Sequence, residues 1–264
     1  MKSRHTLFAV LILALAFSAA GCGKKETSEN APAPEAAAAA TPIDMATVGS
    51  VAGSVKLDGA APKAKPINMA AEPSCASMHT TPQLDESVLV GDGNSLANVV
   101  VYVSDGLGSR TFDAPKTAAT IDQKGCHYVP HVLGLMAGQP ISVTNSDKTT
   151  HNIHPVPQNN REWNKSQPPG APAIEEVFGR EEIAIPVKCN VHPWMKSYVA
   201  VFKHPYFFVT DKDGKFEIKS LPPGSYTLTA WHEKYGASAP VSVTIGAKEA
   251  KTGVAFTFKA ASGD

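Results

Sequence analysis

From Gly49 onward, apolar residues alternate with polar ones or form short runs that end at Gly, Pro, Asn or Asp. Both patterns are typical of β-strands that have at least one buried face. Strands are expected at residues 50–57, 97–103, 140–145, 182–188, 198–202, 206–210, 215–218, 225–230, 241–245 and 254–258. No segment predicts a helix longer than two or three turns, so the pattern indicates an all-β protein.

The amino terminus has a different pattern. Lys2 and Arg4 precede an apolar run of eleven residues, 7–17, and small residues follow up to Cys22. As a helix such a run is about 16 Å long, roughly half of a bilayer core, which is typical of a signal peptide. The ending Ala-Ala-Gly-Cys resembles a lipoprotein lipobox, and this implies cleavage after residue 21 and lipidation of Cys22. Ordinary cleavage stays open, because Ala19 stands where such boxes more often carry Leu.

Residues 22–47 are rich in Ala, Pro, Glu and Ser and hold few bulky apolar side chains. Such a segment cannot offset its ordering entropy by burial, so we expect a disordered tether. The whole chain has 24 Lys and Arg against 24 Asp and Glu, and removal of residues 1–21 leaves 22 cations. Without a basic field, nucleic acid is a poor candidate partner. We expect an exported protein, anchored to the membrane by lipid and facing the periplasm or cell exterior.

Two motifs at opposite ends of the remaining chain belong together. Residues 49–55 read G-S-V-A-G-S-V, and residues 211–228 place a D-K-D-G hairpin turn before L-P-P-G-S-Y-T-L. Together they resemble the carboxypeptidase regulatory-like, or transthyretin-like, sandwich module. About 150 residues separate the two motifs. We therefore expect another unit between them.

That middle part contains H-N-I-H at residues 151–154 and C-N-V-H-P-W-M at residues 189–195. A thiolate, two imidazoles and a thioether are the side chains of a trigonal copper site with a weak axial sulfur. The C-x-x-H-x-x-M loop, together with an upstream H-N after a strand, resembles the cupredoxins, in particular amicyanin- and plastocyanin-like blue copper proteins. The resemblance covers residues 125–202. Within it, residues 162–178 are polar and rich in Pro, and we expect them to be an insert over one sheet.

The cupredoxin resemblance implies one type 1 copper ion with His151, Cys189, His192 and Met195 as ligands. It implies that Asn152 ties the two ligand segments together by hydrogen bonding. It also implies that the outer edge of His192 meets solvent beside an apolar electron-exit patch. The patch residues would be Pro193 and Trp194.

Cysteine parity bears on this site. With Cys22 lipidated, Cys75, Cys126 and Cys189 remain in an oxidising compartment, and one is left over after a single disulfide. If Cys189 binds copper, as the resemblance implies, Cys75 pairs with Cys126. The alternative joins Cys126 to Cys189, leaves Cys75 free and describes a metal-free sandwich.

The expected architecture is a Greek-key β-sandwich protein. It comprises a signal peptide (1–21), a tether (22–47), the first part of a regulatory-like sandwich (48–105), a cupredoxin-like copper segment (106–204) and the second part of the regulatory-like sandwich (205–259). The expected function is one-electron transfer with a redox partner protein of the cell envelope. Two alternatives stay open, a metal-free module that binds glycan or an envelope partner, and copper storage or delivery. No enzyme is expected, because G-x-S-x-G, a glycine-rich phosphate loop and H-E-x-x-H are all missing from the sequence.

Overall fold

The structure is a computed structural model that describes residues 39–260. The predicted signal peptide, Cys22 and most of the tether lie outside the described residues. Within them the all-β prediction is confirmed, since the only helices are α1 (Pro73–Ala76) and one 3-10 turn at Asp92–Asn94. No helix among the described residues has the length and apolar character needed to cross a bilayer.

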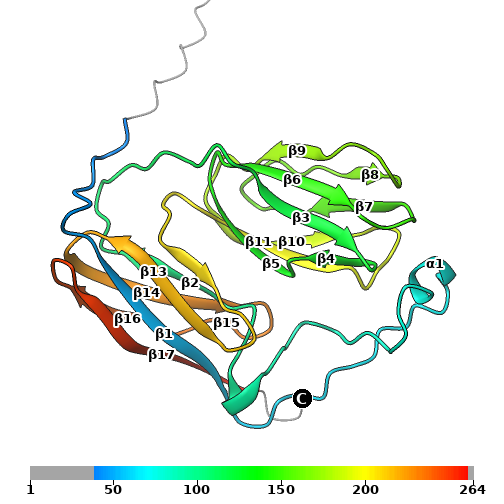
Figure 1. Cartoon of the computed structure of the whole chain (residues 1–264), viewed down its shortest axis with the longest axis horizontal. Coiled ribbons are helices and arrows are strands. Elements are labelled where there is room, and N and C mark those ends of the chain that lie inside the picture. The colour runs from blue at the N-terminus through cyan, green and yellow to red at the C-terminus, as the bar shows by residue number, and fades with distance from the viewer. Residues whose placement is uncertain (1–38, 261–264) are drawn as a thin grey trace, which may run out of the picture. The chain divides into compact units, whose positions relative to one another are not determined.

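The first sandwich is built from the two ends of the described chain. One sheet has the order β13-β1-β17, and the other has the order β12-β2-β14-β15 with β16 also paired to β14 (Figure 1). Their bounds are β1 (Gly49–Asp58), β2 (Val100–Asp105), β12 (Phe207–Val209), β13 (Lys215–Leu221), β14 (Gly224–His232), β15 (Gly236–Ala237), β16 (Val241–Ile245) and β17 (Ala250–Lys259). Alternate residues of both sheets, including Val55, Leu228 and Phe256, share one buried core.

The expected hairpin is not formed: its turn joins β12 to β13, but β12 pairs with β2 and β13 pairs with β1, so the turn crosses from one sheet to the other. Gly214 has φ +63°, a left-handed conformation that costs glycine little, and a Cβ there would lie 2.5 Å from the Val55 carbonyl oxygen. The turn therefore requires glycine both for its backbone angle and for its close approach to β1.

The second sandwich is built from the middle of the chain. One sheet has the order β5-β11-β10-β7-β8 and the other β4-β3-β6-β9. Their bounds are β3 (Ala119–Lys124), β4 (His127–Val129), β5 (Val132–Met136), β6 (Pro140–Asn145), β7 (His151–Pro155), β8 (Lys165–Gln167), β9 (Ile174–Val177), β10 (Glu182–Lys188) and β11 (Lys196–Phe202). Side chains from both sheets, such as Ile141 and Val199, form a second core.

Residues 162–178 differ from the expected insert. They supply β8, which pairs with β7, and β9, which pairs with β6, so each extends the edge of one sheet. The segment was too polar for its strands to be recognised, because an edge strand gains backbone hydrogen bonds without having to bury many side chains.

A third buried cluster links the two sandwiches. Val100 of β2 packs with Val132 of β5 and with Ala200 and Phe202 of β11. Phe202 also stacks on Phe207 of β12, with ring centroids 4.6 Å apart. The strand that follows the candidate ligand loop is thereby held against the first sandwich.

Candidate metal centre

The candidate ligands come from two neighbouring strands and the loop that follows one of them. His151 is the first residue of β7, and Cys189 comes directly after β10. These strands pair, with Lys188 opposite His154. The loop from β10 to β11 carries His192 and Met195, so sheet pairing brings distant segments of sequence to one end of the second sandwich.

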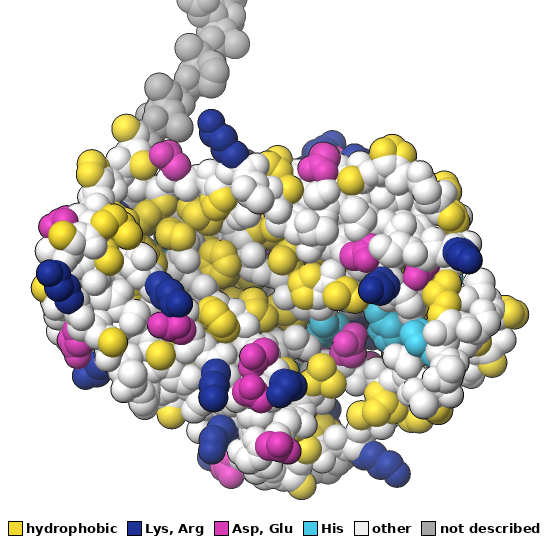
Figure 2. Space-filling model, in the orientation of Figure 1, with side chains coloured by type: hydrophobic (Ala, Val, Ile, Leu, Met, Phe, Trp, Pro, Cys, Tyr) yellow, Lys and Arg dark blue, Asp and Glu magenta, His cyan; other side chains and the backbone are white. Residues whose placement is uncertain are grey.

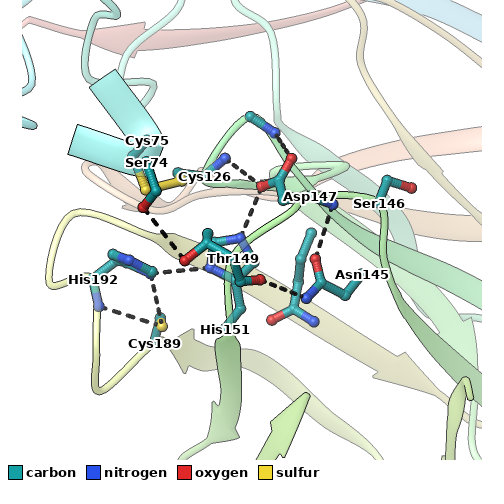
Figure 3. Close-up of polar contacts among 12 residues, drawn as sticks. Ser74, Cys75, Cys126, Asn145, Ser146, Asp147, Thr149, His151, Cys189 and His192 are labelled. Atoms are coloured by element: carbon teal, nitrogen blue, oxygen red, sulfur yellow. Dashed lines mark hydrogen bonds and ion pairs between the residues drawn. A yellow bond between two sulfur atoms is a disulfide. The ribbon is translucent and has the colours of Figure 1, made fainter. Parts of the chain in front are cut away.

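The structure brings three of the four predicted ligands together (Figure 3). One donor atom from each of His151, Cys189 and His192 lies within 4.8 Å of the other two, and all three residues are buried. The two Nδ1 atoms are 3.0 Å apart, and Sγ of Cys189 lies 3.7 Å from Nδ1 of His192. Nδ1 is therefore the nitrogen that His192 turns toward the shared space.

Met195 closes the ligand loop. Its N–H donates to the carbonyl of His192 at 2.9 Å, and its carbonyl accepts the N–H of Cys189 at 3.3 Å. The side chain is fully buried in the same apolar core as Cys189. The loop thus turns back on itself and brings its first and last candidate ligands to one place in the backbone.

The surroundings of Cys189 favour its thiolate. Burial disfavours the charged form, but hydrogen bonds from the His151 side chain and from backbone N–H groups, including that of His192, outweigh it and lower the pKa of Cys189. The His192 N–H lies 3.4 Å from Sγ. Because the thiolate is the form that binds metals, this environment prepares Cys189 for ligation.

Asp147 is a residue that the sequence analysis missed. Its Oδ2 accepts a hydrogen bond from Nε2 of His151 at 2.8 Å. A carboxylate can only accept, so Nε2 carries a proton, and Nδ1 is the nitrogen that turns toward the other candidate ligands and gives up any proton of its own when a metal binds. The other hydrogen bonds to this carboxylate come from the N–H groups of Gly125 and Cys126, at 2.7 and 2.8 Å. A carboxylate four residues before the histidine was the available signal.

Asn152 joins the two ligand segments. Its Oδ1 accepts the N–H of Asn190, the residue after Cys189, and its carbonyl accepts the hydroxyl of Tyr128 at 2.5 Å. Burial and the nearby Cys189 raise the pKa of Tyr128, so this phenol stays protonated and acts as a donor. The first bond holds the start of β7 against the ligand loop, and the second holds it against β4 of the opposite sheet.

The expected exposure of His192 is wrong. Its side chain is only 1 % exposed, because the disulfide between Cys75 and Cys126 lies against it. Pro193 is exposed, whereas Trp194 is half-buried and donates its Nε1–H to the Cys126 carbonyl at 3.1 Å. The rings of Trp194 and His192 are 5.2 Å apart. The predicted patch therefore meets solvent without the histidine edge.

Cys75 and Cys126 are joined by a disulfide, and Cys189 is free and buried. The alternative pairing of Cys126 with Cys189 is therefore wrong. The disulfide attaches α1 to the turn between β3 and β4, next to the candidate ligands (Figure 3). This attachment is the physical reason that His192 is covered.

A separate group of histidines faces carboxylates. Nε2 of His131 pairs with Glu233, while Nδ1 atoms of His131 and His127 lie 3.8 and 3.4 Å from Glu86. Figure 2 shows histidine and acidic side chains next to one another on one face. Burial opposes a charged ring, but the bond to Glu233 and the nearby negative charges outweigh it and raise the pKa of His131. We interpret the contact between His131 and Glu233 as an ion pair that connects the residue after β14 of the first sandwich to the second sandwich.

Residues 197–259 match the model of the carboxypeptidase regulatory-like domain. The match runs from β11 through β17, and so covers the carboxyl-terminal part of the first sandwich. Among curated proteins, none matches the chain.

Several solved structures resemble part of the chain. The copper-containing nitrite reductase NirK from Thermus scotoductus SA-01 is 17 % identical over 37 % of this chain, with a TM-score of 0.31, and the match spans a quarter (25 %) of that protein. A purple cupredoxin from Nitrosopumilus maritimus is 25 % identical over 31 % of this chain and 98 % of its own, with a TM-score of 0.27. The Cu(I) form of a mutant amicyanin is 20 % identical over 38 % of this chain and 97 % of its own, with a TM-score of 0.29.

Proposed function

We propose that this chain is an exported, lipid-anchored protein of the cell envelope that holds one type 1 copper ion and passes single electrons to a redox partner protein. The observation that carries the proposal is the meeting of His151, Cys189 and His192, whose donor atoms lie within 4.8 Å of one another in a buried place. Met195, at the end of the same loop, is the fourth proposed ligand.

The donor set fits copper in both oxidation states. Thiolate and thioether suit Cu(I), while imidazole suits Cu(I) and Cu(II). A bound copper ion would supply the one-electron couple. The chain's own residues hold the donors in place: Asp147 fixes the ring of His151, and Asn152 ties the strand of His151 to the residue after Cys189. Little rearrangement is then needed when the charge of the site changes.

We assign no catalytic residue. Four protein ligands leave no open coordination position for a substrate, and this favours electron transfer over catalysis. The half-buried Trp194, with its ring 5.2 Å from that of His192, supports an electron route that leaves the site beside Pro193.

Titration with Cu(II), followed by absorption spectroscopy, tests the proposal. The protein should take up one equivalent and become intensely coloured through charge transfer from sulfur to copper. Cys189→Ser should abolish the colour. His154→Gln is the matched control, because His154 lies on the same strand but contacts Asn190 and Glu162. A colourless wild-type protein that takes up no copper would instead support a metal-free binding module.

Copper storage or delivery is a second candidate, and the burial of His192 favours it. A histidine edge that is only 1 % exposed offers little direct contact to a redox partner. Voltammetry separates the two functions. Electron transfer requires reversible cycling between Cu(II) and Cu(I), whereas storage requires tight Cu(I) binding without such cycling.

A further inference from the structure

The disulfide lies next to the proposed copper centre. Both sulfur atoms of Cys75 and Cys126 lie within 4.8 Å of a ring nitrogen of His192 and of each other. All three residues are buried, with exposed fractions of 0, 0 and 1 %. His192 therefore belongs to two groups of donors, one with His151 and Cys189 and one with the two disulfide sulfurs (Figure 3).

The two ring nitrogens of His192 have different surroundings. Nδ1 lies 3.0 Å from Nδ1 of His151 and 3.7 Å from Sγ of Cys189. Nε2 is buried and has no hydrogen-bond partner. A buried polar atom without a partner costs free energy and requires an explanation, and a ligand that binds there is one. The second nitrogen of this ring is available for a ligand that the first site does not use.

The chemistry of the two neighbouring cysteine sulfurs indicates which ligand could bind there. In a disulfide the sulfurs are poor metal ligands. A dithiol reductant supplies two electrons and two protons, the S–S bond breaks, two thiols form, and the reductant becomes a disulfide itself. As a metal binds, both thiols release their protons, which gives two thiolates. When Nδ1 of His192 already serves the first site, Nε2 must release its proton as well, so that the ring bridges the two ions as an imidazolate. Soft thiolates select Cu(I).

We infer that reduction of the Cys75–Cys126 disulfide creates a second copper(I) site, formed by the two thiolates and His192. The inference rests on the proposed function for the identity of the metal, and it adds a redox-switched site that the electron-transfer centre does not need. With the disulfide intact, the chain holds one copper ion. With the disulfide reduced, it holds two.

The surroundings keep Cys126 in place when the bond breaks. It lies in the turn between β3 and β4, its N–H donates to Asp147 at 2.8 Å, and its carbonyl accepts Nε1–H of Trp194 at 3.1 Å. Neither hydrogen bond involves the sulfur. Reduction therefore leaves this thiol next to His192.

Cys75 has its own contacts. Its N–H donates to the carbonyl of Glu72 at 2.9 Å within α1. The adjacent Ser74 hydroxyl lies 3.4 Å from that of Thr149, in the segment that leads to His151. Cys75 also packs in the same core as Cys126 and Met69. These contacts hold α1 against the second sandwich without the covalent bond.

Anaerobic titration with Cu(I) against a competing Cu(I) chelator tests the inference. The protein is used in a Cys22→Ser background, which removes a thiol outside the described residues, and is compared before and after treatment with a dithiol reductant that is then removed. Thiol counting should give one thiol before reduction and three after it. Copper(I) uptake should rise from one equivalent to two.

Two variants separate this inference from the proposed function. Cys189→Ser should take up no Cu(I) when oxidised and one equivalent when reduced. Cys75→Ser/Cys126→Ser should take up one equivalent under both conditions. Circular dichroism shows whether each variant folds, and if the double variant does not fold, the result for Cys189→Ser still decides. Retained copper in oxidised Cys189→Ser would overturn the proposed function alone.

The second site is refuted if reduced wild type binds only one equivalent and reduced Cys189→Ser binds none. In that case the disulfide is only a cover for His192. The same measurement would then show faster capture of copper by the chelator after reduction, without any increase in stoichiometry.

Discussion

Each sandwich buries a histidine completely, and the two histidines have opposite environments. His232, at the end of β14 in the first sandwich, packs against the rings of Tyr235 and Phe258. Burial there lowers the pKa of His232 to about 4. Burial also disfavours the charged form of His151 in the second sandwich. Hydrogen bonds to Cys189 and Asp147 outweigh this effect and raise the pKa of His151. Burial alone makes a histidine part of a core, whereas its neighbours make it a candidate ligand.

The largest expected difference between the two sandwiches is in copper affinity when each histidine is replaced with glutamine. His151→Gln should weaken copper binding more than about 100-fold, because loss of an outer partner of a ligand already costs about 10- to 100-fold. His232→Gln should leave copper affinity unchanged in the folded protein. Competition titration measures both. Equal copper affinities in the two variants would contradict the assignment of His151.

The cores of the two sandwiches provide the next comparison. Leu228 of β14 and Ile153 of β7 are both fully buried, and replacing either with Ala should lower the free energy of unfolding by about 3 kcal/mol. Only Ile153→Ala should also weaken copper binding, since Ile153 lies two residues from His151 on the same strand. Urea unfolding and copper titration test the pair. A larger loss of copper affinity in Leu228→Ala would argue against a site confined to the second sandwich.

Asp147→Asn tests the positioning of His151. The amide no longer presents two acceptor oxygens to the ring and the turn, so copper affinity should fall by about 10- to 100-fold and the absorption spectrum should shift. Asp122→Asn is a matched control, because Asp122 accepts hydrogen bonds from Thr144 and Ser146 rather than from a candidate ligand. An unchanged spectrum in Asp147→Asn would show that the carboxylate has no influence on the ligand.

Glu233→Gln tests the ion pair that joins the sandwiches. A raised histidine pKa stabilises the fold fully below the unfolded value of about 6.5, and this contribution is lost as the pH rises through the folded value. The variant should therefore cost about 1.5 kcal/mol at pH 6 and less at pH 9. Urea unfolding at both values measures the difference. A cost that does not change between them would contradict the loss of a charge on His131 in this pH range.

Alternation of polar and apolar residues predicted the long strands well. The bounds of β6, β10 and β16 agree with the expected ranges, because their side chains face a core on one side. The same pattern did not predict other strands. β7 begins with two polar residues, His151 and Asn152, that serve the candidate site, and β8 has only three residues. Such segments become strands through pairing partners that are distant in sequence.

The candidate site was predictable in part for a similar reason. The residue types and the spacing from Cys189 to Met195 singled out the ligand loop, and H-N at residues 151–152 indicated its counterpart. The cover over His192 depends on where α1 lies, and α1 is more than a hundred residues away in sequence. Asp147 acquires its role only when the turn at Cys126 folds against it. Neither contact can be recognised from a local pattern in the sequence.

The most direct test of the central claim is crystallographic. Crystals of the copper-loaded protein, measured at the copper absorption edge, show by anomalous scattering where the ion lies. The account predicts, for the disulfide-bonded protein, one anomalous peak bonded to Nδ1 of His151, Sγ of Cys189 and Nδ1 of His192. A strong peak elsewhere, with these three donors left unbound, would contradict it.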